Sequence, residues 1–450
     1  MTLAAAAPSR EPAGGRGAMT RVAAFSGIPI GTMAALMLAV FTVSMGFGVV
    51  LPLLPFLIER LPGAGGDASE VARATGLLTA IYTLALFLFA PVWGRMSDAF
   101  GRRLVLLTGL AGFGATMLVF SFVENIFALY AERFLSGLFA AAVTPVALAV
   151  VADLAVNEEK RARRLTFVSL AGIGGFLSGP MIGVFLAGGA AGFSANPGTA
   201  GAIATPLAAA AILALFAATA VAFMVPGARP GAVRQKRDHH LGDADRWLVA
   251  WLLALAFVVS AGVGVFEVGL ALRGKQELGL TGAQIALMFT ECSGVMIIVQ
   301  TIVFSPWIAP ATTRWLIAPA FGILAVGLFL VPYASNFTLM LVVIGAVAAS
   351  AGILSPILTF WTSTKAGSAQ GAAFGTQTAA ASLGGTVGAA AGGLLFDVAF
   401  LPDASFVLMT ALTVLGFLMS LPLPDRLASR KPVQSVPVPQ PEGNKNVRAK

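Results

Sequence analysis

The sequence predicts an all-α membrane protein with twelve transmembrane helices in two six-helix bundles. Three observations support this class: the composition, twelve long apolar runs, and a repeat that joins the two halves. The 450 residues are 58% hydrophobic, above the roughly 45–50% apolar share of soluble domains. The runs reach the about 20 residues that cross a bilayer core. We expect helices, because lipid leaves backbone groups no outside partner and the runs lack the alternation of barrel strands.

Twelve spans are expected in chain order, each from one uninterrupted apolar run. They cover residues 32–57, 75–93, 104–122, 127–151, 167–187, 204–225, 247–270, 283–305, 315–332, 337–361, 371–396 and 404–423.

Polar segments divide the chain into parts. The stretch "PGARPGAVRQKRDHHLGDADR", which holds the only two histidines, separates six spans from six. Two adjacent histidines without further ligands are read as solvated linker. We expect a tail at 1–30, bundles at 31–226 and 247–424, a linker at 227–246, and a Pro-rich tail at 425–450 that is too polar to order itself. Pro and Gly near the N-terminus argue against a cleaved signal, and both Met1 and Met19 are possible starts.

An internal repeat supports the division into halves. "GGFLSGPMIG" at 174–183 aligns with "LGGTVGAAAG" at 383–392, so that three glycines in each segment coincide at an offset of 209. "GRMSDAFGRR" at 94–103 falls on "SPWIAPATTR" at 305–314 at an offset of 211. Two nearly equal offsets indicate a duplicated six-helix unit, an arrangement in which transporters bind substrate between the repeats.

The positions of Lys and Arg predict the orientation. With alternating loops, 23 of the 28 basic residues fall on the side that carries both tails, and four fall on the other. Cytoplasmic loops carry the excess of Lys and Arg, so both termini are expected in the cytoplasm. Nucleic-acid binding is not expected, because these charges lie in short loops without an aromatic-studded basic surface.

The loop "GRMSDAFGRR" carries charge in a chain that is only 11% charged. It follows the pattern G-x-x-x-D-x-x-G-R-[KR] through Gly94, Asp98, Gly101, Arg102 and Arg103. Joining the second and third spans on the cytoplasmic side, it resembles the signature loop of the major facilitator superfamily. The resemblance extends over 30–424 and implies the 6+6 pseudo-symmetric fold of that family.

The resemblance implies a gating role for Asp98. In the family this carboxylate latches the two halves by meeting a helix N-terminus of the other half, and the eleventh span begins here near Gln370. A helix N-terminus carries partial positive charge, so the contact would be reversible. The alternative is that the loop only sets the topology.

Two further stretches match motifs of the family. "YAERFLSG" in the fourth span matches R-x-x-x-G through Arg133 and Gly137, and the family links this arginine to proton coupling. An intramembrane arginine is costly enough to suggest function; alternatively, it reaches the outer interface beside Glu132. "GGFLSGPMIG" matches the drug-antiporter motif G-x-x-x-G-P-x-x-G, with generic helix packing as the alternative. The residues of this motif are Gly175, Gly179, Pro180 and Gly183.

The first span, "MGFGVVLPLLPFL", also resembles drug antiporters. It lacks the acid that tetracycline exporters carry before the glycine pair, which makes tetracycline a poor candidate substrate. The second half has two candidate proton carriers, Glu267 near the outer end of the seventh span and Glu291 within the eighth. Glu291 is preferred, because it is roughly 12 Å from its helix end at about 1.5 Å per residue. Glu267 could instead lie at the interface.

The sequence therefore predicts a proton-coupled secondary transporter in the inner membrane, which exports small, amphiphilic organic molecules by alternating access. The expected partners are the substrate, protons and the lipid bilayer, and a monomer is expected. By resemblance, the cavity is lined by the first, fourth, seventh and tenth spans.

No ATP-binding loop occurs and a single cysteine, Cys292, leaves too few soft ligands for zinc, so no cofactor is expected. Without clustered His, Cys or paired carboxylates, an enzyme is not expected. Open alternatives are an importing symporter or uniporter, and a receptor or assembly factor.

Overall fold

The computed structural model describes residues 28–59, 67–123, 125–154, 158–188, 200–227, 243–305, 307–365, 370–396 and 403–428. The tails, most of the 227–246 linker, both histidines and the two possible start residues lie outside these ranges. All regular elements in the described ranges are helices.

Six membrane-length segments form the first half of the chain. They are α2 (Ile30–Val50) continued by η1 (Leu51–Leu53) and α3 (Leu54–Ile58), α4 (Ala68–Phe100), α5 (Arg102–Phe120), α6 (Ile126–Ala140) followed by α7 (Val143–Leu154), α8 (Glu158–Gly188) and α9 (Ala200–Met224).

Six more form the second half. They are α10 (Asp243–Gln276), α11 (Gly282–Val303), η3 (Pro310–Leu316) with α12 (Ile317–Leu330) and η4 (Val331–Tyr333), α13 (Phe337–Lys365), α14 (Gln370–Leu394), and α15 (Ala404–Ser420) followed by α16 (Leu423–Ala428).

Each of the twelve expected spans coincides with a helical segment, but several helices are longer or broken. Helix α10 continues to Gln276, six residues beyond the expected end at 270. The fourth span breaks between Ala140 and Val143. Proline explains this break, because the ring of Pro145 clashes with the carbonyl four residues earlier, at Ala141. Pro52 and Pro55 likewise accompany the short 3-10 turn between α2 and α3.

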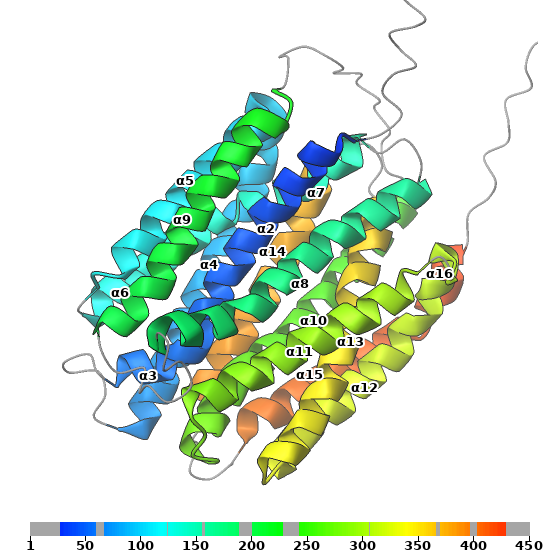
Figure 1. Cartoon of the computed structure of the whole chain (residues 1–450). Coiled ribbons are helices and arrows are strands. Elements are labelled where there is room, and N and C mark those ends of the chain that lie inside the picture. Colours follow the sequence, from blue (N-terminus) through cyan, green and yellow to red (C-terminus); the bar gives the residue numbers. More distant parts are fainter. Residues whose placement is uncertain are drawn as a thin grey trace, which may run out of the picture.

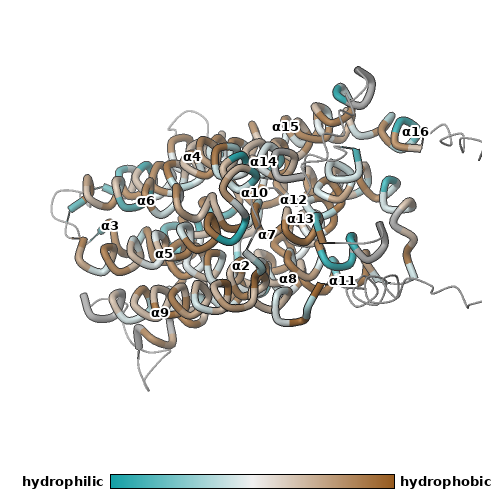
Figure 2. The backbone as a smooth tube through the Cα atoms, turned by 90° about the horizontal axis from the view of Figure 1, so that it is seen from above, coloured by the Kyte–Doolittle hydropathy of each residue, from teal (hydrophilic) through white to brown (hydrophobic). Residues whose placement is uncertain are grey.

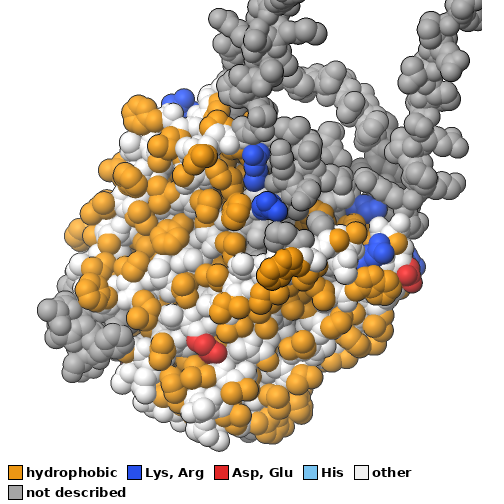
Figure 3. Space-filling view, turned by 45° about the vertical axis from the view of Figure 1, so that its right-hand side comes forward, with side chains coloured by type: hydrophobic (Ala, Val, Ile, Leu, Met, Phe, Trp, Pro, Cys, Tyr) orange, Lys and Arg blue, Asp and Glu red, His pale blue; other side chains and the backbone are white. Residues whose placement is uncertain are grey.

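The outer surface of the bundle suits a bilayer. Ten helices in the described ranges are long and apolar enough to cross a membrane, and α15 is a shorter apolar helix. Apolar residues predominate along the helices in Figure 2, and hydrophobic side chains cover most of the face in Figure 3. The Lys and Arg side chains visible on that face lie along its upper and right-hand part. Lipid rather than water is the medium that such a surface fits.

The two halves lie side by side, with α4 packed against α14 and α8 against α11 (Figure 1). We call the end of the bundle where α2 begins and α15 ends the tail end, and the opposite end the far end.

The glycine motif of the fifth span joins helices within one half. A Cβ on Gly175 would overlap the carbonyl of Phe41, and one on Gly179 would lie 2.7 Å from the carbonyl oxygen of Met45, so both glycines let α8 touch α2. Gly384 and Gly388 meet the carbonyls of α10 in the same way. The duplicated sequence therefore builds the same helix pair in each half.

Candidate functional site

A central cavity of about 500 Å³ lies between the two halves. Helices α2, α4, α7 and α8 line it from the first half, and α10, α13 and α14 line most of the other side. The four spans expected from the sequence therefore contribute, as do the second, fifth and eleventh. The volume falls within the roughly 300–1,000 Å³ of small-molecule sites.

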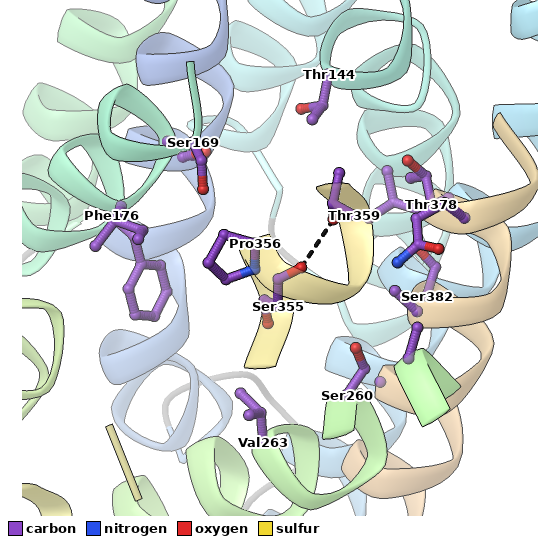
Figure 4. A pocket seen from close by; sticks show the side chains of 18 of the residues that line it. Thr144, Ser169, Phe176, Ser260, Val263, Ser355, Pro356, Thr359, Thr378 and Ser382 are labelled. Carbon is purple, nitrogen blue, oxygen red and sulfur yellow. Dashed lines mark hydrogen bonds between the residues drawn. The ribbon is translucent and has the colours of Figure 1, made fainter. Parts of the chain in front are cut away.

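The cavity lining mixes aromatic rings with hydroxyl groups that come from both halves (Figure 4). Phe176 of α8 lines the cavity, and Phe47, which also lines it, stacks on Phe176 with ring centroids 5.8 Å apart. Across from Phe176, hydroxyl groups line the walls formed by α10, α13 and α14. They belong to Ser260, Ser355, Thr359, Thr378 and Ser382. This distribution suits a molecule with both an apolar body and polar groups.

An amide on α14 adds an unused hydrogen-bond acceptor to the lining. Gln377 of α14 is only 7% exposed, and its Oε1 atom has no partner among the described residues. A buried polar atom without a partner costs free energy that a bound donor would recover. This atom is therefore available to a substrate.

Among the described lining residues, Glu267 is the only Asp, Glu, Lys, Arg or His. It is nine residues from the end of α10, roughly 14 Å at about 1.5 Å per residue, and is therefore deeper than expected. No described residue forms an ion pair or hydrogen bond with its carboxyl group. Val268, the next residue, and Leu272, five residues onward, pack against Ala72, Ala80 and Ala389 in an apolar cluster that crosses the two halves. Glu267 therefore lies beneath an apolar seal.

Glycines and an ion pair complete the closure of the far end. A Cβ on Gly76 of α4 would lie 2.6 Å from the Cα of Gly393 of α14, so the two backbones touch. Beyond them, the Nζ of Lys275 lies 2.5 Å from Oε1 of Glu59 and donates a hydrogen bond of 2.9 Å to the Pro55 carbonyl. Because Lys275 belongs to the second half and Glu59 to the first, we call these contacts the far-end latch.

Arg133 and Glu132 form a buried ion pair away from the cavity. They are 2% and 3% exposed, and Nε of Arg133 lies 2.7 Å from Oε2 of Glu132. The guanidinium also lies 4.4 Å from the centroid of the Phe120 ring. Neither residue lines the central cavity. Tyr82 connects the pair to the cavity, since its ring centroid is 5.8 Å from the guanidinium and the ring stacks on Phe47.

Glu291 lies on α11 beside α13, outside the lining of the central cavity. Its Oε1 atom would be 3.6 Å from a Cβ at Gly345, and its Oε2 atom is buried with no partner among the described residues. The structure therefore separates Glu291 and Arg133, and neither group faces the cavity.

The signature loop turns sharply between α4 and α5. Gly101 has a φ of 99°, which favours glycine, and Gly94 is buried. The Nη2 atom of Arg102 lies 2.6 Å from Oδ1 of Asp98 and 3.1 Å from Oδ2 of Asp153, which is at the end of α7. Asp153 was not predicted as a site residue from the sequence. An acidic residue at the tail end of a span is the signal that could have indicated its ion pair with Arg102. The side chains of Gln370 and Gly371, expected beside Asp98, are outside the described set.

A family model described as the Major Facilitator Superfamily matches residues 36–366. The chain belongs to the major facilitator superfamily. It is therefore a multi-pass membrane protein and a secondary transporter rather than an enzyme, and the predicted fold class is confirmed.

Two curated relatives are similar over most of their length. Multidrug resistance protein 2 of Bacillus subtilis (strain 168) is 27% identical, over 80% of this chain and 87% of the relative. Quinolone resistance protein NorA of Staphylococcus aureus (strain COL) is 25% identical, over 80% of this chain and 88% of the relative. A solved structure, the human organic anion transporter MFSD10 (TETRAN), matches with a TM-score of 0.69 at 20% identity. The match covers 87% of this chain and 100% of the human chain. At this identity it is evidence for the fold alone.

Proposed function

We propose that this protein exports small, amphiphilic organic molecules in exchange for protons by alternating access. The observation that carries the proposal is Glu267, the one charged side chain among the described lining residues, at the closed end of a cavity that combines aromatic rings with hydroxyl groups. The names of the two bacterial relatives, which refer to multidrug and quinolone resistance, support the export of organic molecules.

The orientation proposed from the positions of Lys and Arg tells which side of the membrane each end of the bundle faces. With both termini in the cytoplasm, the tail end faces inward and the sealed far end faces outward. The cavity lining reaches Thr359 and Gln377, within seven residues of the tail-side ends of α13 and α14. Substrate would therefore enter from the cytoplasm or inner leaflet. The bundles at 31–226 and 247–424 would rock about the α4–α14 and α8–α11 contacts to expose it on the other side.

Glu267 takes first place among the four proposed proton-coupling residues. A carboxyl group that touches the substrate cavity can lose its proton when a cationic substrate arrives and regain it after release, which couples the two fluxes. Glu291 lacks this contact with the cavity, and Glu132 is already paired with Arg133. We propose that the Glu132–Arg133 pair supports coupling indirectly, through Tyr82.

The charge of the lining also limits the substrate. An anionic substrate would meet one carboxyl group and no basic side chain among the described lining residues. Burying an unpaired charge costs free energy, so cationic and neutral amphiphiles are favoured over anions.

Transport in inside-out membrane vesicles tests the proposal, with ethidium as a fluorescent cationic probe and an imposed proton gradient. We expect wild-type vesicles to accumulate ethidium, Glu267→Gln to lose gradient-driven accumulation while still binding the probe, and Glu291→Gln to retain most of it. Full accumulation by Glu267→Gln together with loss in Glu291→Gln would reverse the assignment. Probe movement that ignores the proton gradient would favour a uniporter, and no transport of any probe would favour a receptor.

A further inference from the structure

A second, smaller chamber of about 160 Å³ lies beside the central cavity. The two spaces share lining residues from α8, α10, α11 and α13, among them Ile173, Phe176 and Glu267. The chamber alone reaches Phe266, Cys292, Val347 and Ala348. Glu267 therefore lines both spaces and marks their junction.

The size of the chamber selects one small ring. An engineered protein cavity of about 150 Å³ lined by apolar side chains binds benzene. A chamber of about 160 Å³ therefore accommodates a phenyl group with small substituents. A fused three-ring system would have to remain in the larger cavity.

The walls of the chamber suit an aromatic ring. Phe176 and Phe266 supply aromatic surfaces, and Cys292 and Met296 supply polarizable sulfur atoms, which make favourable contacts with ring edges. Apart from Glu267, the described residues of this lining carry no charged group. A positive charge attached directly to a bound ring would therefore lie next to the carboxylate of Glu267.

We propose that this chamber is a subsite for the aromatic ring of an aryl-alkyl cation, with Glu267 at its entrance receiving the cationic group. The inference rests on the proposed function, which places the substrate in the central cavity, and adds where one part of the substrate binds.

The subsite also connects binding to the movement of the halves. Gly172, Ile173 and Phe176 come from α8 of the first half, and the remaining walls come from the second half. The ring of Phe176 meets that of Phe289 edge to face across this boundary, with centroids 6.0 Å apart. Rocking that turns α8 relative to α11 would change the shape of the chamber and release the ring.

Cys292 provides a native reporter inside the subsite, because it is the only cysteine in the chain. Purified protein in detergent would be labelled with N-ethylmaleimide, and the rate followed by intact-mass spectrometry. Benzyltrimethylammonium should slow labelling at least about fivefold. Tetramethylammonium, which has the charge without the ring, should leave the rate within twofold, as should an anthracenylmethyl analogue whose rings are too large. Cys292→Ser protein, which gains no mass, confirms the labelled position.

A second readout separates the chamber from the central cavity. Ala348→Leu fills the chamber, whereas Ala346→Leu makes the same change in an outward groove between α12 and α13. Thermal stabilisation by increasing benzyltrimethylammonium gives its affinity, since ligands that bind only the folded state raise stability. We expect about a tenfold weaker affinity in Ala348→Leu and no more than a twofold change in Ala346→Leu. Ethidium accumulation should survive in Ala346→Leu.

The outcomes distinguish the two proposals. Binding of benzyltrimethylammonium that neither protects Cys292 nor weakens in Ala348→Leu would overturn the subsite and leave the exporter proposal intact. Equal protection by tetramethylammonium would overturn the ring assignment. Absence of binding by all three cations, together with absent ethidium transport in wild-type vesicles, would overturn both.

Discussion

Adding one methyl group where the two halves touch should shift the protein toward the conformation that is open at the far end. The change is Gly76→Ala on α4. Its Cβ would lie 2.6 Å from the Cα of Gly393, 2.7 Å from the carbonyl oxygen of Ala389 and 2.8 Å from the nitrogen of Gly393. All three atoms belong to the backbone of α14, so no side chain can rotate away.

The magnitude follows from the overlap. To reach 3.4 Å, the lower limit of ordinary contact, the methyl carbon must move about 0.8 Å away from the Cα of Gly393. Forcing an extra methyl group into a packed contact costs about 1–3 kcal/mol. If only the far-end-closed conformation carries this cost, its population relative to the open one falls about 5–150-fold. Gly174→Ala on α8 is the matched control, since a Cβ there meets no atom within 4 Å.

Spin labels would measure this shift. Glu70 on α4 and Leu339 on α13 are exposed at the far end in opposite halves, and cysteines there, with Cys292→Ser, accept labels by themselves. Pulsed electron paramagnetic resonance should show a longer-distance population in Gly76→Ala and the wild-type distribution in Gly174→Ala. An unchanged distribution in Gly76→Ala would refute the argument that the α4–α14 contact holds the far end closed.

Three further predictions concern the far-end latch, the buried ion pair and the orientation in the membrane. Lys275→Met should remove the far-end latch to Glu59 and lengthen the same spin-label distance, whereas identical distances would show that the apolar seal suffices. Glu132→Gln should lower thermal stability strongly, because leaving Arg133 as an uncompensated buried charge costs about 3–5 kcal/mol; a melting temperature near that of the wild type would contradict the buried pair. Tags at both chain ends should be cytoplasmic and a reporter near Gly63 outside, and a cytoplasmic signal near Gly63 would invert the orientation.

The linear sequence was sufficient for features that depend on local composition. Apolar runs of membrane length gave all twelve segments, because a segment in lipid must satisfy its own backbone groups whatever its neighbours are. The loop with Asp98 and Arg102 gave the family, and its glycine at position 101 adopts the positive φ that the turn requires. The repeated glycines predicted a duplicated unit, which the matching helix pairs then displayed.

The placement of the carboxyl groups depended on tertiary structure. Depth counted along single helices ranked Glu291 above Glu267, yet only Glu267 lines the cavity. A helix that is apolar on all sides carries no signal of which face meets its neighbours, so its rotation about its own axis is set by packing. The longer α10, the pairing of Glu132 with Arg133 and the chamber beside Cys292 likewise arise from contacts between helices distant in the chain.

The sequence by itself determined which segments enter the membrane and to which family they belong. Only the packing of α8, α10, α11 and α13 decided which side chains share a cavity, because that choice depends on how helix surfaces fit together.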